Sequence, residues 1–190
     1  MKCPYLIGRR IYFRPLKPED LKNGYLDWVN DPEMHQLLDS AKRPISEYNL
    51  KKYYQQIMES ENDVMFAVIE KKTDKHIGNV KLGKIDWIHR HANYGRMIGD
   101  KRARGKGYGT EILQMLMEYA FNTLNLNRLY TPVLENNIAS IKSNEKAGMV
   151  KEGVSKQARL IDGTYVDVVN FAMTHDRYRK LYGQKSKKRS

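Results

Sequence analysis

The sequence predicts a single domain of the mixed α/β class, and three observations support this prediction. The chain has 190 residues, which suits one compact domain. Runs typical of strands are interspersed with segments whose apolar residues recur every three or four positions, as in helices. No internal repeat and no linker divides the chain. We expect one domain over residues 1–183 and a basic, disordered tail over residues 184–190.

The first elements expected are a strand and two helices. The strand covers residues 11–14 and is stopped by Pro15. Pro18 and the acidic residues after it open a helix that ends before Asp31-Pro32. Its apolar stripe is Leu21, Tyr25, Trp28 and Val29. Ser46 caps a second helix. The stripe of this second helix is Leu50, Tyr53, Tyr54, Ile57 and Met58.

Strands dominate the next part of the chain. They are expected over residues 64–69, 76–82 and 94–98, with a polar turn over residues 71–75. A glycine-rich stretch then leads into the clearest helix. Its apolar residues are Ile112, Leu113, Leu116, Met117, Ala120, Phe121 and Leu124.

The last third of the chain is expected to add a strand, a short helix and a hairpin. The strand covers residues 128–134 and contains Pro132, which cannot donate a ladder hydrogen bond. The helix, residues 139–146, is capped by Asn136 or Asn137 and ended by Gly148. Two strands, residues 157–160 and 166–173, form a hairpin about Asp162-Gly163.

The composition excludes several classes of protein. Lys and Arg number 34 against 22 Asp and Glu, so the net charge of +12 favours anionic partners. Cys3 is the only cysteine, which excludes an internal disulfide and a cysteine zinc cluster, and the five histidines contain no HExxH pair. No apolar run is long enough for a membrane span, and the N-terminus lacks a signal peptide. We therefore expect a cytoplasmic protein without a metal.

The densest cationic segment coincides with the glycine-rich stretch. Residues 101–106 carry four cations, and glycines stand at 105, 107 and 109, just before the long helix. Glycines let a backbone approach a ligand closely, and a helix N-terminus favours an anion. A Walker loop is excluded because Gly-Lys-Ser/Thr is absent, and a dinucleotide fingerprint because the acidic residue about 20 positions on is missing. The stretch therefore predicts a pyrophosphate cradle built mainly from backbone N–H groups.

A second motif lies 30 residues further on. It contains Asn137-x-x-Ser140, followed by Glu145-Lys146-x-Gly148. Together with Arg102-x-x-Gly105-x-Gly107, it resembles the GNAT superfamily of acetyl-CoA-dependent N-acetyltransferases, in its Rim-type branch, named for ribosomal-protein N-terminal acetyltransferases. The resemblance covers nearly all of residues 8–180.

The resemblance implies a fold and a cofactor site. The fold is a mixed, mostly antiparallel sheet of six to seven strands with about four flanking helices. Its fourth and fifth strands are parallel and splay apart around the pantetheine arm of acetyl-CoA, and the N–H groups of residues 104–109 face the pyrophosphate. The cofactor-binding residues implied are Met97, Ile98, Arg102, Arg104, Gly105, Lys106, Gly107, Tyr108, Gly109, Thr110, Asn137 and Ser140.

The implied chemistry is direct attack of a neutral primary amine on the thioester in a ternary complex, with no metal. A backbone N–H of the fourth strand stabilises the oxyanion. Many family members have a Tyr where this chain has Asn144, so Ser140 becomes the candidate that protonates or orients the thiolate. Many relatives have a Glu where this chain has Asn93, so His89 or His91 is a candidate base acting through water. Proximity of the substrates is the alternative to a dedicated base.

The acceptor amine is the least determined part. The expected acceptor-site residues are Trp28, Asn30, Tyr53 and Tyr54. A nucleotide-linked amino sugar is preferred because the positive chain disfavours a polycation, followed by a protein N-terminus and then by spermidine or another polyamine. Other classes stay open: a basic nucleic-acid-binding module, which the absence of RRM, KH and zinc-finger patterns disfavours, and a CoA-binding protein without catalysis. The oligomeric state is also open, a homodimer included.

Overall fold

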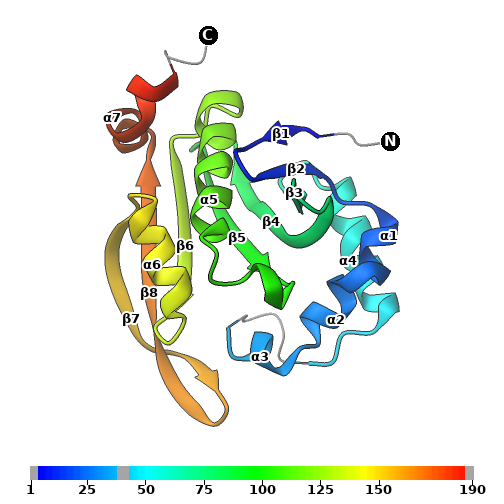
Figure 1. Ribbon diagram of the computed structural model, residues 1–190. Helices are drawn as coiled ribbons and strands as arrows, with labels where there is room; N and C mark the ends of the chain where they lie inside the picture. The colour runs from blue at the N-terminus through cyan, green and yellow to red at the C-terminus, as the bar shows by residue number, and fades with distance from the viewer. Residues whose placement is uncertain (1–3, 38–42, 187–190) are drawn as a thin grey trace.

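The computed structural model describes residues 4–37 and 43–186 and contains an eight-stranded sheet in the order β1-β2-β3-β4-β5-β6-β8-β7 (Figure 1). The strands are β1 (Leu6–Ile7), β2 (Ile11–Pro15), β3 (Val64–Glu70), β4 (Lys75–Asp86), β5 (His91–Ile98), β6 (Arg128–Leu134), β7 (Val150–Ile161) and β8 (Thr164–Thr174). The helices are α1 (Pro18–Asp20), α2 (Leu26–Val29), α3 (Pro32–His35), α4 (Glu47–Glu59), α5 (Tyr108–Glu118), α6 (Ile138–Lys146) and α7 (His175–Ser186). The expected fold class is confirmed, but six to seven strands is too few, because short β1 pairs with β2.

The sheet is interrupted at its centre. Every neighbouring pair is antiparallel except β5 and β6, which run parallel. Their register has only three pairs, His91–Arg128, Ala92–Leu129 and Asn93–Tyr130, and the strands then diverge (Figure 1). Pro132, which has no N–H, comes two residues after Tyr130, the last residue of β6 that pairs with β5. The expected strands did not include β1, so β5 and β6 correspond to the predicted fourth and fifth strands. The predicted splay of these two strands is confirmed.

Two hydrophobic cores lie on opposite faces of the sheet. Alternate side chains of a strand point to opposite faces, so Phe66 and Val68 join the core under α5. Met65, Ala67 and Ile69 of the same strand join a second core with α2, α3 and α4. Each strand that is buried on both faces therefore reads as a continuous apolar run.

The first predicted helix is broken, contrary to the continuous stripe expected. The backbone kinks at Asn23 and at Gly24, which has φ +108°, between α1 and α2. The Trp28 ring packs against Gly24 and Gly99, where a Cβ on Gly99 would lie 1.9 Å from the ring. This kink directs the chain into α3, a helix that the sequence pattern did not reveal.

Several local predictions are confirmed at the level of single atoms. Ser46 caps α4 by accepting a hydrogen bond from Asn49 N at 3.1 Å, and Asn137 caps α6. Gly148, with φ +76°, follows the end of α6. Met58, by contrast, is 43 % exposed and does not belong to the apolar stripe of α4.

The C-terminal part differs from the expectation. The hairpin about Asp162-Gly163 is present, but β7 begins at Val150, seven residues earlier than predicted. Helix α7 was not predicted and continues to Ser186, so the backbone of residues 184–186 is helical. The remaining tail residues, 187–190, lie outside the described residues.

A buried ion pair fixes α1 to β2. The two oxygens of Asp20 accept hydrogen bonds from Arg14 at 2.6 and 2.7 Å, and Lys17 N adds a third at 2.8 Å. Burial by itself would raise the pKa of Asp20, but the hydrogen bonds from Arg14 and Lys17 outweigh it and lower the pKa.

Asp20→Asn is expected to lower the free energy of unfolding at pH 7 by about 3 kcal/mol, because Arg14 loses its partner while buried. A lowered folded pKa means that the carboxylate's contribution is present above its ordinary pKa, about 4, and is lost as the pH falls through the folded value. Urea unfolding at pH 7 and pH 3 should therefore show the difference between the two proteins shrinking at pH 3. Glu47→Gln, which removes an exposed pair with Lys22, is the control and should change little. An equal difference at both pH values would contradict this account.

Candidate active site

A cleft of about 320 Å³ opens where β5 and β6 diverge. It is lined by the inner edges of both strands, by the start of α6 and by the β7–β8 hairpin. The lining residues are Leu37, Asn93, Tyr94, Gly95, Arg96, Thr131, Pro132, Val133, Leu134, Asn137, Ser140, Arg159 and Val168. The backbone of β5 beyond Asn93 has no strand partner on this side, so its polar groups are available to a bound ligand.

The loop predicted to cradle a phosphate lies directly before α5. Gly105 and Gly107 have φ values of +73° and +79°, a region that side chains other than glycine rarely adopt. Gly107 is the N-cap of α5, whose first N–H groups have no partners within the helix. The N–H of Arg104 donates to Lys101 O at 3.2 Å and is therefore not available to a phosphate. Of the N–H groups expected to face the pyrophosphate, those of residues 104–109, the first is thus excluded. The cradle starts at Gly105.

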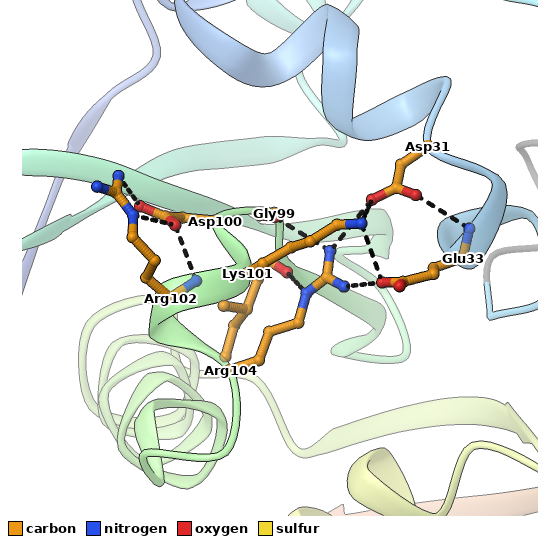
Figure 2. A network of polar contacts seen from close by, with 8 residues as sticks. Asp31, Glu33, Gly99, Asp100, Lys101, Arg102 and Arg104 are labelled. Carbon is orange, nitrogen blue, oxygen red and sulfur yellow. Dashed lines mark hydrogen bonds and ion pairs between the residues drawn. The ribbon is translucent and has the colours of Figure 1, made fainter.

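The arginine side chains of this loop do not face the cradle (Figure 2). Arg104 donates to Glu33 Oε2 at 2.7 Å and to the carbonyls of Ile98 and Gly99, each at 3.1 Å. Arg102 pairs with Asp100 at 2.8 Å. The sequence predicted that both cations would hold pyrophosphate. In the structure Arg104 is engaged by Glu33 and by two carbonyls of its own loop, whereas Arg102 pairs with Asp100 two residues earlier and keeps its side chain 71 % exposed.

The same network joins the loop to α3. Lys101 Nζ lies 3.2 Å from Asp31 and 3.4 Å from Glu33, which also pairs with Arg104 (Figure 2). Of the predicted cationic side chains, Lys106 is exposed, while its carbonyl accepts a hydrogen bond from Arg10 at 2.7 Å.

Other predicted cofactor residues lie near the loop in different roles. Tyr108 is buried, with its hydroxyl donating to Glu70 at 2.6 Å and the Arg10 guanidinium 4.5 Å above its ring. The Met97 side chain belongs to the core beneath α2 and α4, and Ile98 packs against the other core. Met97 and Ile98 can therefore contact a pantetheine arm only with their backbone. Gly109 and Thr110 form the first turn of α5.

Asn137 and Ser140 lie together at the cleft, as predicted. Asn137 Oδ1 accepts from Ser140 N at 3.1 Å, which caps α6 and holds the Ser140 hydroxyl at the cleft wall. Ser140 Oγ also lies 3.4 Å from Arg96 Nη2.

Sequence reasoning missed Arg96. It lies on β5, half-buried, and binds a polar cluster made of Tyr94 on the same strand and Ser143 and Asn144 on α6. Its signal was an arginine among the buried residues Tyr94 and Met97 of the strand. Burial raises the pKa of Tyr94, and the nearby Arg96 only partly offsets this effect.

His89 and His91 are not at the cleft. Both lie at the start of β5, at the opposite end of the strand from the cradle, and their rings stack 6.3 Å apart. His89 is exposed in a turn held by its N–H bond to Asp86 at 2.7 Å. The structure thus contradicts the hypothesis that His89 is a base. Asn93, at the cleft, donates its side-chain amide to Tyr130 O at 3.3 Å.

The predicted acceptor residues do not line the cleft either. Trp28 packs on glycines, and Asn30 bridges Leu26 O and Ile45 through three hydrogen bonds. Tyr54 donates to Leu16 O at 3.4 Å, and Tyr53 lies under Lys81. All four lie in the α2–α4 layer, and Trp28 also lines a separate cavity of about 870 Å³. Leu37 and Arg159 reach the cleft instead.

Comparison with known proteins gives the family of this fold and site. Residues 10–150 match the family model described as an acetyltransferase (GNAT) domain. The chain belongs to the GNAT acetyltransferase family. This GNAT protein is 30 % identical over 176 residues to a probable N-acetyltransferase, YjcK, of Bacillus subtilis, covering 85 % of this chain and 92 % of the relative. It is 31 % identical over 111 residues to a spermidine N(1)-acetyltransferase of Vibrio cholerae, and the match covers 58 % of this chain and 64 % of the relative.

Solved structures agree. The crystal structure of spermidine N-acetyltransferase from Vibrio cholerae in complex with CoA and spermine superposes with a TM-score of 0.81 at 25 % identity, over 89 % of this chain and 98 % of the relative. This GNAT protein is therefore an N-acetyltransferase that uses acetyl-CoA. These comparisons establish the family, and the narrower Rim-type branch stays a prediction. Among the described residues, no helix is long and apolar enough to cross a membrane.

Gly109→Ala should separate cofactor binding from folding. A Cβ at this position would meet Arg96 and Ser143 at 3.7 Å, an ordinary contact, and alanine favours a helix. The melting temperature should therefore not fall. The added methyl lies at the cradle, so the KM for acetyl-CoA should rise about tenfold, the loss of about 1.4 kcal/mol of binding.

Gly153→Ala on β7 is the matched control, because a Cβ there would meet nothing within 4 Å. It should leave the KM unchanged. A Gly109→Ala protein with the wild-type KM would show that the phosphates do not approach this turn.

Proposed function

We propose that the acceptor is a primary amine carried by a neutral or anionic molecule, with a nucleotide-linked amino sugar as the preferred example. The observation that carries this proposal is the charge of the cleft. Arg96 and Arg159 line it, and no Asp or Glu does so among its described lining residues. An anionic acceptor is attracted to such a site, whereas a polycation is repelled.

Carboxylates near the cleft are already engaged. Asp31 and Glu33 pair with Lys101 and Arg104, and Asp162 accepts a hydrogen bond from Gln36 at 3.3 Å. The position at which many family members carry a Glu is Asn93, which is neutral. The cleft thus offers little negative charge to a cationic substrate.

The transfer step needs little acid–base machinery under this proposal. The amine must be neutral to attack, and the lining residues include no group suited to deprotonate it directly. Water in the open cleft takes the proton, and alignment of amine and thioester supplies the rate advantage. The unpaired N–H groups of β5 are positioned to bind the oxyanion. Ser140 can orient the sulfur.

A polyamine is the second candidate, and the relatives favour it. Two of the comparisons are with spermidine N-acetyltransferases of Vibrio cholerae, one of them bound to spermine. A protein N-terminus, as in the Rim-type branch, is the third. A homo-oligomer in the cytoplasm is compatible with all three, and a solved structure of the Vibrio relative is dodecameric.

The acceptor class can be decided by measuring thiol release from acetyl-CoA with three panels: UDP-linked amino sugars, spermidine and spermine, and N-terminal peptides. The proposal predicts the highest kcat/KM with a UDP-linked amino sugar. Higher turnover of spermidine than of every anionic amine would overturn the acceptor proposal and leave the acetyltransferase assignment intact.

Arg159→Gln tests the charge argument directly. It should raise the KM of an anionic acceptor about tenfold and leave the KM of acetyl-CoA within twofold, because only the acceptor side loses a cation. Lys156→Gln, an exposed cation on the same strand that pairs with Asp167, is the matched control. Equal effects on the two substrates would indicate a structural role for Arg159.

A further inference from the structure

Arg96 bridges the gap between β5 and α6. Its Nη2 lies 3.0 Å from Asn144 Oδ1, 3.3 Å from Ser140 O and 3.4 Å from Ser140 Oγ, and it also donates to Ser143 Oγ. Its Nη1 donates to the Tyr94 hydroxyl at 3.4 Å. These contacts hold a guanidinium at the wall of the cleft, in a fixed orientation.

Asn144 carries an unused donor at the same place. Its side chain is fully buried, and its Oδ1 accepts from both Tyr94 and Arg96. Its Nδ2 has no hydrogen-bond partner in the part of the chain that the structure describes. The Asn144 side chain is not among the residues that line the cleft, so it acts by orienting Arg96 through Oδ1.

Tyr94 is a poor alternative as the acid of the reaction. Its hydroxyl is buried and already donates to Asn144. Burial raises the pKa of the phenol, which weakens it as a proton donor. Arg96 lines the cleft and is half-buried, and its Nε, close to the first turn of α5, has no recorded acceptor within the described residues.

We propose that Arg96, held in place by Asn144 Oδ1, binds the sulfur of CoA and stabilises it as the leaving thiolate. The chain thereby replaces a neutral tyrosine acid by a permanent cation. This proposal concerns the acetyl-CoA half of the site and holds for any acceptor amine.

The step balances without a proton from the protein. The amine lone pair forms the N–C bond, the C–S bond breaks, and its electron pair goes to sulfur. The proton lost by nitrogen goes to water. Arg96 keeps all its protons and pairs with the thiolate, which takes a proton from water after CoA leaves.

The pairing makes CoA binding depend on pH in a defined direction. The free thiol has a pKa near that of cysteine, about 8.5, and a cation beside the sulfur lowers it. Product binding should therefore tighten as the pH rises from 7 to 9. The charged or titratable groups lining the cleft are Tyr94 on β5, Arg96 itself and Arg159 on β7, while the described lining residues of β6 and α6 are uncharged. Arg96 and Arg159 stay positively charged over this pH range, and Tyr94 becomes negative only above the pKa of its phenol, which burial raises. These groups therefore add no negative charge that would weaken the binding of the CoA thiolate.

Titration calorimetry with CoA and with desulfo-CoA at pH 7 and pH 9 tests the proposal. In the wild-type protein, the affinity ratio of CoA to desulfo-CoA should rise about tenfold between the two pH values, which corresponds to about one unit of pKa. Arg96→Gln should abolish this rise and lower kcat about 100-fold. Arg96→Lys keeps the positive charge and should retain part of the pH-dependent rise in the affinity ratio and part of the wild-type kcat.

Arg159→Gln is the control for removing a cation from the same cleft, and it should keep the pH-dependent ratio. A ratio that stays constant with pH in the wild-type protein would overturn the proposal, even if Arg96→Gln does not fold. An Arg96→Gln protein that keeps the pH-dependent affinity ratio of CoA to desulfo-CoA, and a kcat within threefold of the wild type, would also overturn the proposal. Thermal melting of each variant separates loss of fold from loss of the sulfur contact.

Discussion

The divergence of β5 and β6 is the constraint on which the rest of this structure depends. A sheet is stable when its backbone N–H and C=O groups are paired, and here the pairing stops after Asn93–Tyr130. The unpaired edges are bridged from the side, by α6 and by the Arg96 cluster that ties β5 to it. The opening therefore costs backbone hydrogen bonds and gains a ligand site whose polar groups are fixed in advance.

Charge pairing explains how a chain of net charge +12 builds a selective site. The cationic segment before α5 does not present a uniform positive surface, because Asp100 and Glu33 bind Arg102 and Arg104. The Glu33–Arg104 pair secures the loop to α3, whereas the Asp100–Arg102 pair lies within the loop. Two further arginines, Arg96 and Arg159, line the cleft, where no Asp or Glu stands among the described lining residues. Position, rather than net charge, thus decides what each cation does.

Local features were predictable because their physics is local. The glycines of the cradle, the cap at Asn137 and the strand interruption at Pro132 each depend on a few neighbouring residues. The kink at Gly24 was not predictable, because a glycine in a helical stripe is tolerated as often as it breaks the helix. His89 was misplaced for a similar reason, since nothing near it in sequence shows at which end of β5 the cleft opens.

The sequence by itself determined the fold class through its periodicity, and the resemblance of its two motifs gave the GNAT family, because both are properties of the chain alone. The tertiary structure decided which side chains work at the cleft. One partner of Arg104, Glu33, lies 71 residues away, and most partners of Arg96 lie on α6, 44 to 48 positions along. Contacts at such separations depend on how strands and helices pack, and no local pattern encodes them.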